Sequence, residues 1–463
     1  MTIEEILTSK DGAESIISAL KKKSIKVPAW EGEGGLRSQY DPKMHPVMDE
    51  AIYPNIVDDD GHVDFVPRIT LGFQKLAAKR MTELTIVSRV YKPENENQKQ
   101  VAEWMDKIFQ RNRIDSVNTD RLVKLYAGCE FFTIWYAVEQ PTSSNIYGFS
   151  SKLKLRCRTF SPMDGDSLYP MFDEYGDMVA MSIGYKRRKD DHDVNYFDTY
   201  TANKHYRWSD ESGGWQLVEG MPEDIKIAKI PGVYCYRPEP IWEDTSNNVY
   251  EIEWSLSRDG HYLKKNSKPV FAVFADEQIA YGDSKDENGS GKDIMQYPTN
   301  GRAEYITWQQ AIENLKFYTN ELRSLYFTQL QLPDWSYEKM SQVAMSGESR
   351  KQLFIDCMLK VKDESGRLLE AFDREVNVVK GWLKVMMPHV ANDIDTLVVE
   401  TQITPFTIDD EKDTISNLLL ANGNKPIMSQ RESIEAYGQS SDVDQTMKEI
   451  ADESKQDVFK AYE

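Results

Sequence analysis

Residues 241–388 decide the fold, and they open with the sequence IWEDTSNNVYEIEWSLSRDGHYLKKNS at 241–267. The pattern of this stretch predicts a helix, a short β insert, a second helix (WQQAIENLKFYTNELRSLYFTQ, 308–329), a polar loop and one very long helix. Nothing in it resembles an active site. The order describes a subunit that contributes two helices and a loop to something shared, as a ring around a central channel requires.

The first two helices each carry a narrow apolar seam. In the first, apolar residues recur at spacings near multiples of 3.5, at Trp242, Val249, Ile252, Leu256 and Leu263. In the second, the seam alternates by four and three, at Ala311, Leu315, Tyr318, Leu322 and Leu325. Two interpretations stay open, because seam residues such as Leu256 and Leu322 can pack within the chain or against the next subunit.

The third helix is predicted over 350–386, with Leu368, Phe372, Val376, Val379, Leu383 and Met386 on one stripe. Globular proteins average about 11 residues per helix, so this length suggests a spine. Gly366 is a candidate kink, and Pro388 ends the helix. Between the first two helices we expect a strand at 268–275, a polar loop at 281–292 and a return strand at 294–306. A polar loop at 330–349 precedes the long helix.

The N-terminal half predicts a mixed α+β domain with an antiparallel sheet. The first sixty residues are expected to form an irregular arm with a short helix-like start at 3–20. Helices are expected next at 67–80, 95–111 and 115–128, with a strand at 84–91. Short strands parted by turn residues follow, at 131–138, 153–160, 178–187, 195–200, 205–208 and 215–218. The domain closes at Ile230-Pro231. Beyond the long helix we expect a strand at 397–403 and helices at 409–421, 429–437 and 442–461.

The length, charge and cysteine pattern of the chain argue against several classes of function. A chain of 463 residues is long enough for two or more substructures, and it has no apolar run of membrane-spanning length. We therefore expect a soluble, cytosolic protein that contacts no membrane. With 76 acidic and 56 basic residues the net charge is −20, which argues against a tight, nonspecific grip on a phosphate backbone. The four cysteines are scattered, so we expect reduced, mostly buried thiols.

Motifs for catalysis, metals and cofactors are missing. The six histidines form no HExxH pattern and no close pair, so a metal site is not expected. The stretch Gly289-Ser290-Gly291-Lys292-Asp293 resembles a phosphate-binding loop only superficially, because Asp286 replaces the leading glycine and Asp293 replaces the Ser or Thr. Acidic pairs such as Glu251 and Glu253 are the type that a glycosidase uses, but 76 acids make chance pairs common. We expect no cofactor and no catalysis.

Several segments together resemble the portal protein of tailed bacteriophages, the head-to-tail connector. The helix, glycine and aromatic strand around Ala127-Gly128-Cys129-Glu130-Phe131-Phe132 are similar to that family's pattern. So are Ser161-Pro162-Met163 with the strand after it, the segment FDTYTANKHYRW at 197–208, and Ile427 to Glu432 near the C-terminus. Each motif is weak alone, and the order of elements carries the resemblance over nearly the whole chain.

The resemblance implies an α+β, multidomain subunit. Its parts are a mixed α/β wing, a two-helix stem, a small α/β clip, a long spine helix and a helical crown. The implied divisions are a wing at 1–240, stem helices at 241–267 and 308–329, a clip at 268–307, a tunnel loop at 330–349, the long wing helix and return strand at 350–407, and the crown at 408–463.

The resemblance also implies partners. The subunit would form a cyclic homo-oligomer, a dodecamer, at the capsid vertex of the virion after assembly in the host cytoplasm. Double-stranded DNA would pass through its channel, the terminase large subunit and later a head-completion adaptor would dock on the clip, and major capsid and scaffold proteins would seat it. The hypothetical clip contacts are Asp276, Glu277, Asp283, Asp286 and Glu287.

Hypothetical DNA contacts lie around the tunnel loop. Lys339, Arg350 and Lys351 flank it, although solvated charges at a loop and a helix start explain them as well. Trp335 and Tyr337 can touch DNA or neighbouring loops, or simply cap a local cluster beside Pro333. The alternative to a ring is a soluble, acid-based hydrolase acting on carbohydrate, and a third possibility is a capsid-associated adaptor or scaffold partner. A ring predicts a very large cyclic oligomer without turnover, and a hydrolase predicts a small oligomer whose activity depends on one acid pair.

Overall fold

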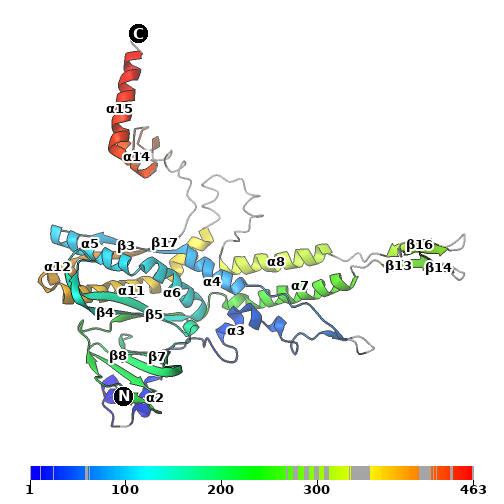
Figure 1. The fold of residues 1–463 in the computed structure, drawn as a ribbon, viewed down its shortest axis with the longest axis horizontal. Coiled ribbons are helices and arrows are strands. Elements are labelled where there is room, and N and C mark those ends of the chain that lie inside the picture. Colours follow the sequence, from blue (N-terminus) through cyan, green and yellow to red (C-terminus); the bar gives the residue numbers. More distant parts are fainter. Residues whose placement is uncertain are drawn as a thin grey trace. The chain divides into compact units, whose positions relative to one another are not determined.

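The computed structural model divides the chain into two compact units, Met1–Asp334 with Asp356–Phe406, and Trp335–Ile355 with Thr407–Glu463. Figure 1 shows the elements of both. The residues that the structure describes are 2–10, 12–23, 25–57, 61, 63–266, 270–274, 280–285, 291–296, 302–306, 312–332, 334, 355–405, 415, 419–420, 422–423, 425–437 and 442–460.

A helical layer covers one face of a small sheet in the first unit. Helices α5 (Glu96–Arg111), α6 (Ile114–Gly128) and α11 (Ile355–Met386) agree with the predicted positions. The side chain of Asn95 accepts a hydrogen bond from the Gln98 amide at 2.8 Å and so caps α5. Gly366 does not interrupt α11, and Pro388 follows its end in a short 3-10 turn (Pro388–Val390) before α12 (Ala391–Thr396).

The β region forms two antiparallel sheets. The first has the order β12-β4-β5, with bounds Gly232–Tyr236, Glu130–Ser144 and Ser151–Phe160. The second has the order β10-β9-β8-β7-β6, with β11 also pairing β9. Its bounds, in chain order from β6 to β11, are Ser167–Phe172, Met178–Lys189, His192–Tyr200, Lys204–Ser209, Gln216–Leu217 and Glu223–Asp224. Strands β6, β11 and β12 were not predicted. The domain does not close at Pro231, because β12 follows directly and pairs with β4.

A two-stranded ribbon joins distant parts of the chain. Strands β3 (Thr85–Lys92) and β17 (Val398–Pro405) were predicted singly, and they pair antiparallel with Arg89 opposite Thr401. Helix α4 (Phe73–Leu84) precedes β3, so the predicted start at Pro67 is wrong. The reason lies in α7 (Ser246–Asn266): the Ile69 amide donates to Ser257 Oγ at 3.0 Å and the Leu71 amide to Glu253 Oε1 at 2.6 Å, which holds this segment against that helix.

The N-terminal region is packed against the rest of its unit. It contains α1 (Ile3–Leu7), α2 (Ala13–Leu20), α3 (Leu36–Tyr40), the 3-10 turns Pro42–Met44 and Pro46–Met48, and the paired β1 (Ile56–Val57) and β2 (Val63–Asp64). Ile6, Ile17 and Leu20 share a core with Phe197 and Trp208 of the second sheet. Helices α1 and α2 confirm the helix-like start expected at 3–20, and burial of apolar side chains such as Leu36 and Val47 orders further parts of the arm.

Helices α7 and α8 (Ile312–Leu330) contact each other, and the chain leaves along α7 and returns along α8 (Figure 1). Between them β13 (Val270–Phe274) pairs with β16 (Arg302–Ile306), and β14 (Ala280–Lys285) pairs with β15 (Gly291–Gln296). The predicted polar loop at 281–292 is thus wrong over most of its length. The polar side chains of this stretch give no strand signal in the sequence. The hairpin nevertheless forms because strands pair through backbone N–H and C=O groups, and every residue except proline supplies both.

The second unit contains α14 (Gln430–Tyr437) and α15 (Val443–Lys460). The Glu432 amide donates to Ser429 Oγ at 3.2 Å, and the Ser429 amide donates to Glu432 Oε2 at 2.9 Å. This reciprocal capping box begins α14 where the sequence predicts it. The helix expected at 409–421 lies mostly outside the described residues.

The four cysteines are free thiols, and burial raises the pKa of Cys129 and Cys235 to about 12 and of Cys157 and Cys357 to about 11. Among the described helices, none combines the length and apolar character that a membrane crossing needs. Within the described ranges, no three metal-binding side chains lie close enough together to hold an ion.

Candidate functional site: the long helices and the buried ion pairs that hold them

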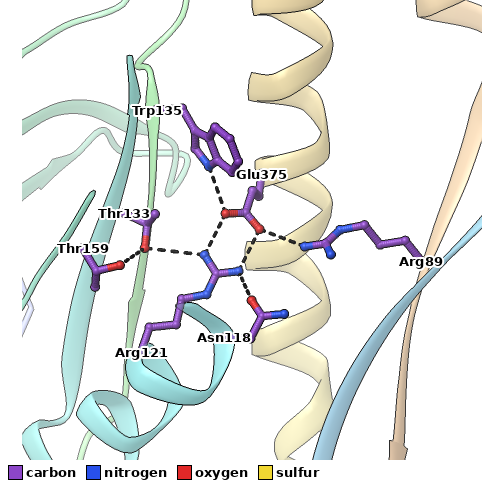
Figure 2. Close-up of polar contacts among 7 residues, drawn as sticks. All are labelled: Arg89, Asn118, Arg121, Thr133, Trp135, Thr159 and Glu375. Atoms are coloured by element: carbon purple, nitrogen blue, oxygen red, sulfur yellow. Dashed lines mark hydrogen bonds and ion pairs between the residues drawn. The ribbon is translucent and has the colours of Figure 1, made fainter. Parts of the chain in front are cut away.

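Helix α11 places one carboxylate in the core, and that carboxylate collects side chains from three other elements. Glu375 is fully buried and lies between Arg121 of α6, Arg89 of β3 and Trp135 of β4 (Figure 2). Arg121 makes two bonds of 2.7 Å to the two carboxylate oxygens, Arg89 donates to Oε2 at 3.1 Å, and the Trp135 indole donates to Oε1 at 3.0 Å. Arg121 also donates to Asn118 at 2.6 Å.

The electrostatics of this cluster favour the ionised pair. Burial opposes the charge on Glu375, but Arg121, Arg89 and Trp135 together outweigh burial and hold the pKa of Glu375 below its ordinary value. Arg121 further lies over the Phe372 ring, 4.7 Å from its centroid. Arg121, Arg89 and Trp135 come from three different elements, and all donate to this one carboxylate of α11. We therefore infer that the cluster fixes the register of α11 against the sheet.

A second buried pair fixes α7. Glu253 Oε1 lies 2.7 Å from His45 Nδ1, and both side chains are fully buried. The other ring nitrogen of His45 lies 2.8 Å from the Gln39 carbonyl, which can only accept, so Nε2 carries a hydrogen. At the next residue of α7, the Trp254 ring contacts the Tyr53 ring in a tilted arrangement, with centroids 4.5 Å apart. Residues 45–53 and 69–71 are therefore held against α7 by polar and aromatic contacts.

Helix α8 contacts α7 through exposed polar bonds and leaves part of the predicted seams uncovered. Tyr318 donates to Glu251 at 3.2 Å, and Asn248 donates to Gln329 at 3.0 Å. Val249 and Ile252 are buried, as the first seam predicts. Other seam side chains stay open to solvent in the single subunit, namely Leu263 (48% exposed), Tyr318 (44%) and Leu325 (41%). A single subunit therefore leaves part of the apolar seams of α7 and α8 exposed to solvent.

The sequence-predicted site residues fall almost entirely outside the described part of the chain. Of the DNA-contact candidates, Trp335, Tyr337, Lys339, Arg350 and Lys351 all lie there. So do Asp276, Glu277, Asp286 and Glu287 of the clip candidates. Asp283 is in β14, where the strand register sets it opposite Asp293.

The acid pair Glu251 and Glu253 does not have the geometry of a hydrolase. Two carboxylates must face each other across a cleft for glycoside hydrolysis. Glu251 is exposed beside α8, and Glu253 is buried against His45 and the Leu71 amide. Residues two apart on a helix point to different sides, so the two carboxylates do not face each other across a cleft.

Sequence reasoning missed the buried carboxylates of Glu375 and Glu253 and their partners. A signal was available, because Glu375 falls inside the apolar stripe of the long helix, beside Phe372 and Val379. Glu253 likewise follows Ile252 on the buried side of α7. A charged residue inside an apolar stripe indicates a buried ion pair, since an unpaired charge there would be too costly.

A third buried carboxylate, Asp198, lies at the facing surfaces of the two sheets. Arg207 donates to its two oxygens at 2.8 Å each, and the hydroxyls of Tyr185 and Tyr200 donate to Oδ2 at 3.2 Å. Burial raises the pKa of Asp198, but Arg207 and His205 outweigh burial and hold that pKa at about 2, below the ordinary 3.8.

Stability should therefore fall in acid through Asp198. A carboxylate with a depressed pKa contributes its full stabilisation, here about 2 kcal/mol, above the unfolded-state pKa and loses it as the pH falls toward the folded-state value. Asp198→Asn is expected to lower the melting temperature at pH 7 and to flatten its decline between about pH 4 and about pH 2. The matched control is Asp191→Asn, because Asp191 is 96% exposed. Equal acid sensitivity of wild type and Asp198→Asn would contradict this assignment.

Comparison with known proteins identifies one family. A family described as "Phage portal protein, SPP1 Gp6-like" matches residues 35–459. No curated protein sequence matches the chain. Among solved structures, a chain from "Neck of empty GTA particle computed with C6 symmetry" is 10% identical, with 80% of this chain and 90% of that chain covered and a TM-score of 0.39. The assignment rests on the sequence match, which spans most of the chain.

Proposed function

Because the chain belongs to the SPP1 Gp6-like family of phage portal proteins, we propose that it forms the ring channel through which DNA is packaged into the capsid and later ejected. Portal proteins of this family are structural, and they form an oligomeric ring at the capsid vertex of the virion. The observation that carries the proposal is the family match, which includes the whole run from α7 through the paired strands and α8 to α11.

The proposed parts follow this order. Residues 1–240 and 350–407 form the wing, 241–267 and 308–329 the stem helices, 268–307 the clip, 330–349 the tunnel loop and 408–463 the crown. The buried clusters at Glu375 and Glu253 suit this division, because each ties a long helix to the α+β body. A ring that transmits force along its helices needs them rigidly anchored.

The channel would conduct DNA without gripping it. A net charge of −20 per subunit makes the assembly repulsive to a polyanion overall. In this proposal the few contacts come from the tunnel loop and its flanks, at Trp335, Tyr337, Lys339, Arg350 and Lys351. The terminase large subunit and then a head-completion adaptor dock on the clip through Asp276, Glu277, Asp283, Asp286 and Glu287, and capsid and scaffold proteins seat the wing during assembly in the host cytoplasm.

The oligomer is proposed to be a dodecamer with no membrane contact and no cofactor. Exposed seam residues on α7 and α8, such as Leu263 and Leu325, support a neighbour along the stem, since exposed apolar patches mark interaction surfaces. Electron microscopy of the purified protein, with mass measured in parallel, tests this proposal. Rings with a central hole and about twelve times the subunit mass are expected. Monomers or dimers at high concentration, in the presence of scaffold protein as well, would contradict it.

The tunnel loop gives a separate prediction. Deleting residues 334–346 is expected to leave ring assembly unchanged and to impair DNA packaging or retention. Apart from Asp334, which pairs with Arg323 of α8 at 3.0 Å, the deleted residues are proposed to touch only DNA and neighbouring loops. Ring assembly is checked by electron microscopy, and packaged DNA by nuclease protection in infected cells. Normal packaging by the deletion variant would show that the loop assignment is wrong.

A further inference from the structure

One face of the sheet β12-β4-β5 is covered at one end only. Phe132, Ile134 and Phe160 on this face are buried against the second sheet. Further along β4, on the same face, Tyr136 is 40% exposed and Val138 is 45% exposed. The opposite face is covered throughout this stretch, with Trp135 and Leu155 in the core that includes α5 and α11. The outer half of the first face is therefore an unpartnered surface.

Strand β5 lines this uncovered half with cations. Alternate residues of a strand share a face, which puts Lys152, Lys154, Arg156 and Arg158 together. The register sets Arg156 opposite Tyr136 and Lys154 opposite Val138, so basic and apolar side chains lie in adjacent rows. Within the described residues none of the four makes an ion pair within 4.0 Å. Four such cations in a chain of net charge −20 form a distinct basic surface.

The basic surface leads into a cleft of about 500 Å³ between the two sheets. Arg158 and Arg187 both lie against the Tyr185 ring, 5.5 Å and 5.2 Å from its centroid. Stacking on a ring restrains a guanidinium while its N–H groups stay able to bind an anion. The cleft is also lined by the exposed acids Glu139, Glu223 and Asp224.

We propose that this surface, defined by Lys152, Lys154, Arg156, Arg158 and Arg187 with Tyr136 and Val138, docks an acidic segment of another protein that carries apolar side chains between its carboxylates. Charge complementarity selects an acidic partner. Arginine and tyrosine are the residues that most often dominate protein–protein interfaces. One feature disfavours double-stranded DNA: Tyr136 and Val138 have no apolar counterpart on a phosphate backbone. The proposal goes beyond ring formation and does not depend on it.

The test measures binding of two fluorescent probes to the full-length protein by anisotropy. The first is a 12-residue synthetic peptide with alternating Glu and Tyr or Leu, and the second is a 12-base-pair DNA duplex. The variant Lys154→Glu/Arg156→Glu reverses two cations that stack on no ring, so the fold is expected to persist and is checked by its melting temperature. The control Lys22→Glu/Lys26→Glu makes the same charge change at two exposed lysines on the N-terminal segment.

Wild type and the control should bind the peptide equally, and the surface variant should bind at least about tenfold more weakly, since each close charge pair at an interface is worth about 1.5 kcal/mol or more. The DNA duplex should bind more weakly than the peptide. The proposal is overturned by peptide binding that is absent, or equal in the two charge-reversed variants. Tighter binding of DNA, lost in the surface variant, would assign the surface to nucleic acid instead.

Discussion

Replacing Glu375 with glutamine is expected to lower the free energy of unfolding by about 3–5 kcal/mol, the cost of leaving a buried charge without its partner. The substitution keeps the side-chain shape, so the loss reports on charge and hydrogen bonding. Glutamine cannot accept all the bonds that Arg121, Arg89 and Trp135 donate, and its amide hydrogens oppose their N–H groups. Denaturant unfolding followed by tryptophan fluorescence measures the change.

The matched control is Glu370→Gln on the same helix. Glu370 pairs with Arg374 at 2.7 Å, but its side chain is 63% exposed. Exposed pairs contribute about 0–1 kcal/mol, so this variant should unfold close to wild type. If both substitutions cost the same, the buried cluster would not be what fixes α11. Because Glu375 has a depressed pKa, its contribution is lost as the pH falls through that folded-state value, so wild type and Glu375→Gln should converge in stability in acid.

Replacing Glu253 with leucine is expected to cost about 3 kcal/mol and to release the residues around His45 and Leu71 from α7, since it leaves a buried histidine nitrogen and a backbone amide without their hydrogen-bond partner. His45 Nδ1 and the Leu71 amide, at 2.7 Å and 2.6 Å from Glu253 Oε1, both lose their partner. Hydrogen exchange read by mass spectrometry should show faster exchange over 45–71, together with a lower melting temperature.

The control lies two residues away. Glu251 is exposed and accepts bonds from Tyr318 and Ser255, so Glu251→Leu should change stability by less than about 1 kcal/mol. Exchange over 45–71 should stay at the wild-type rate in this variant. Unchanged protection of 45–71 in Glu253→Leu would mean that the aromatic contact of Tyr53 with Trp254 alone holds the segment.

Sequence patterns predicted many helix boundaries well, because the interactions that set those boundaries join residues that are close together in the chain. The Asn95 cap, the Pro388 stop and the Ser429–Glu432 capping box each set a helix boundary through neighbours within a few residues. The apolar stripe of α11 marked the buried residues Leu368, Phe372 and Val379 correctly. Where a boundary depended on a distant group, prediction failed: the segment before α4 is held by Ser257 and Glu253 of α7.

For the strands too, the individual elements could be predicted from the sequence, whereas the pairing between distant strands could not. The strands at 84–91 and 397–403 were predicted from their composition, but their pairing across some three hundred residues was not. The sequence predicts a loop over β14 and the first residues of β15, since the polar side chains there carry no period-2 signal, and a strand only from Ile294 on. Strand β12 lies between Pro231 and the proline-rich stretch 238–240, and it gains its strand structure from pairing with β4.

The sequence by itself determined the order of the helices from residue 241 to Pro388, and that order pointed to the portal family; the first of them begins at Ser246, after a 3-10 turn at Glu243–Thr245. Periodicity and caps act within a few turns, so they can be read from the chain alone. Only the tertiary structure decided which carboxylates are buried with which cations, and which half of the β4–β5 face stays open above its basic row. Those features depend on desolvation and on contacts between residues far apart in the chain, and neither quantity exists until the elements pack together.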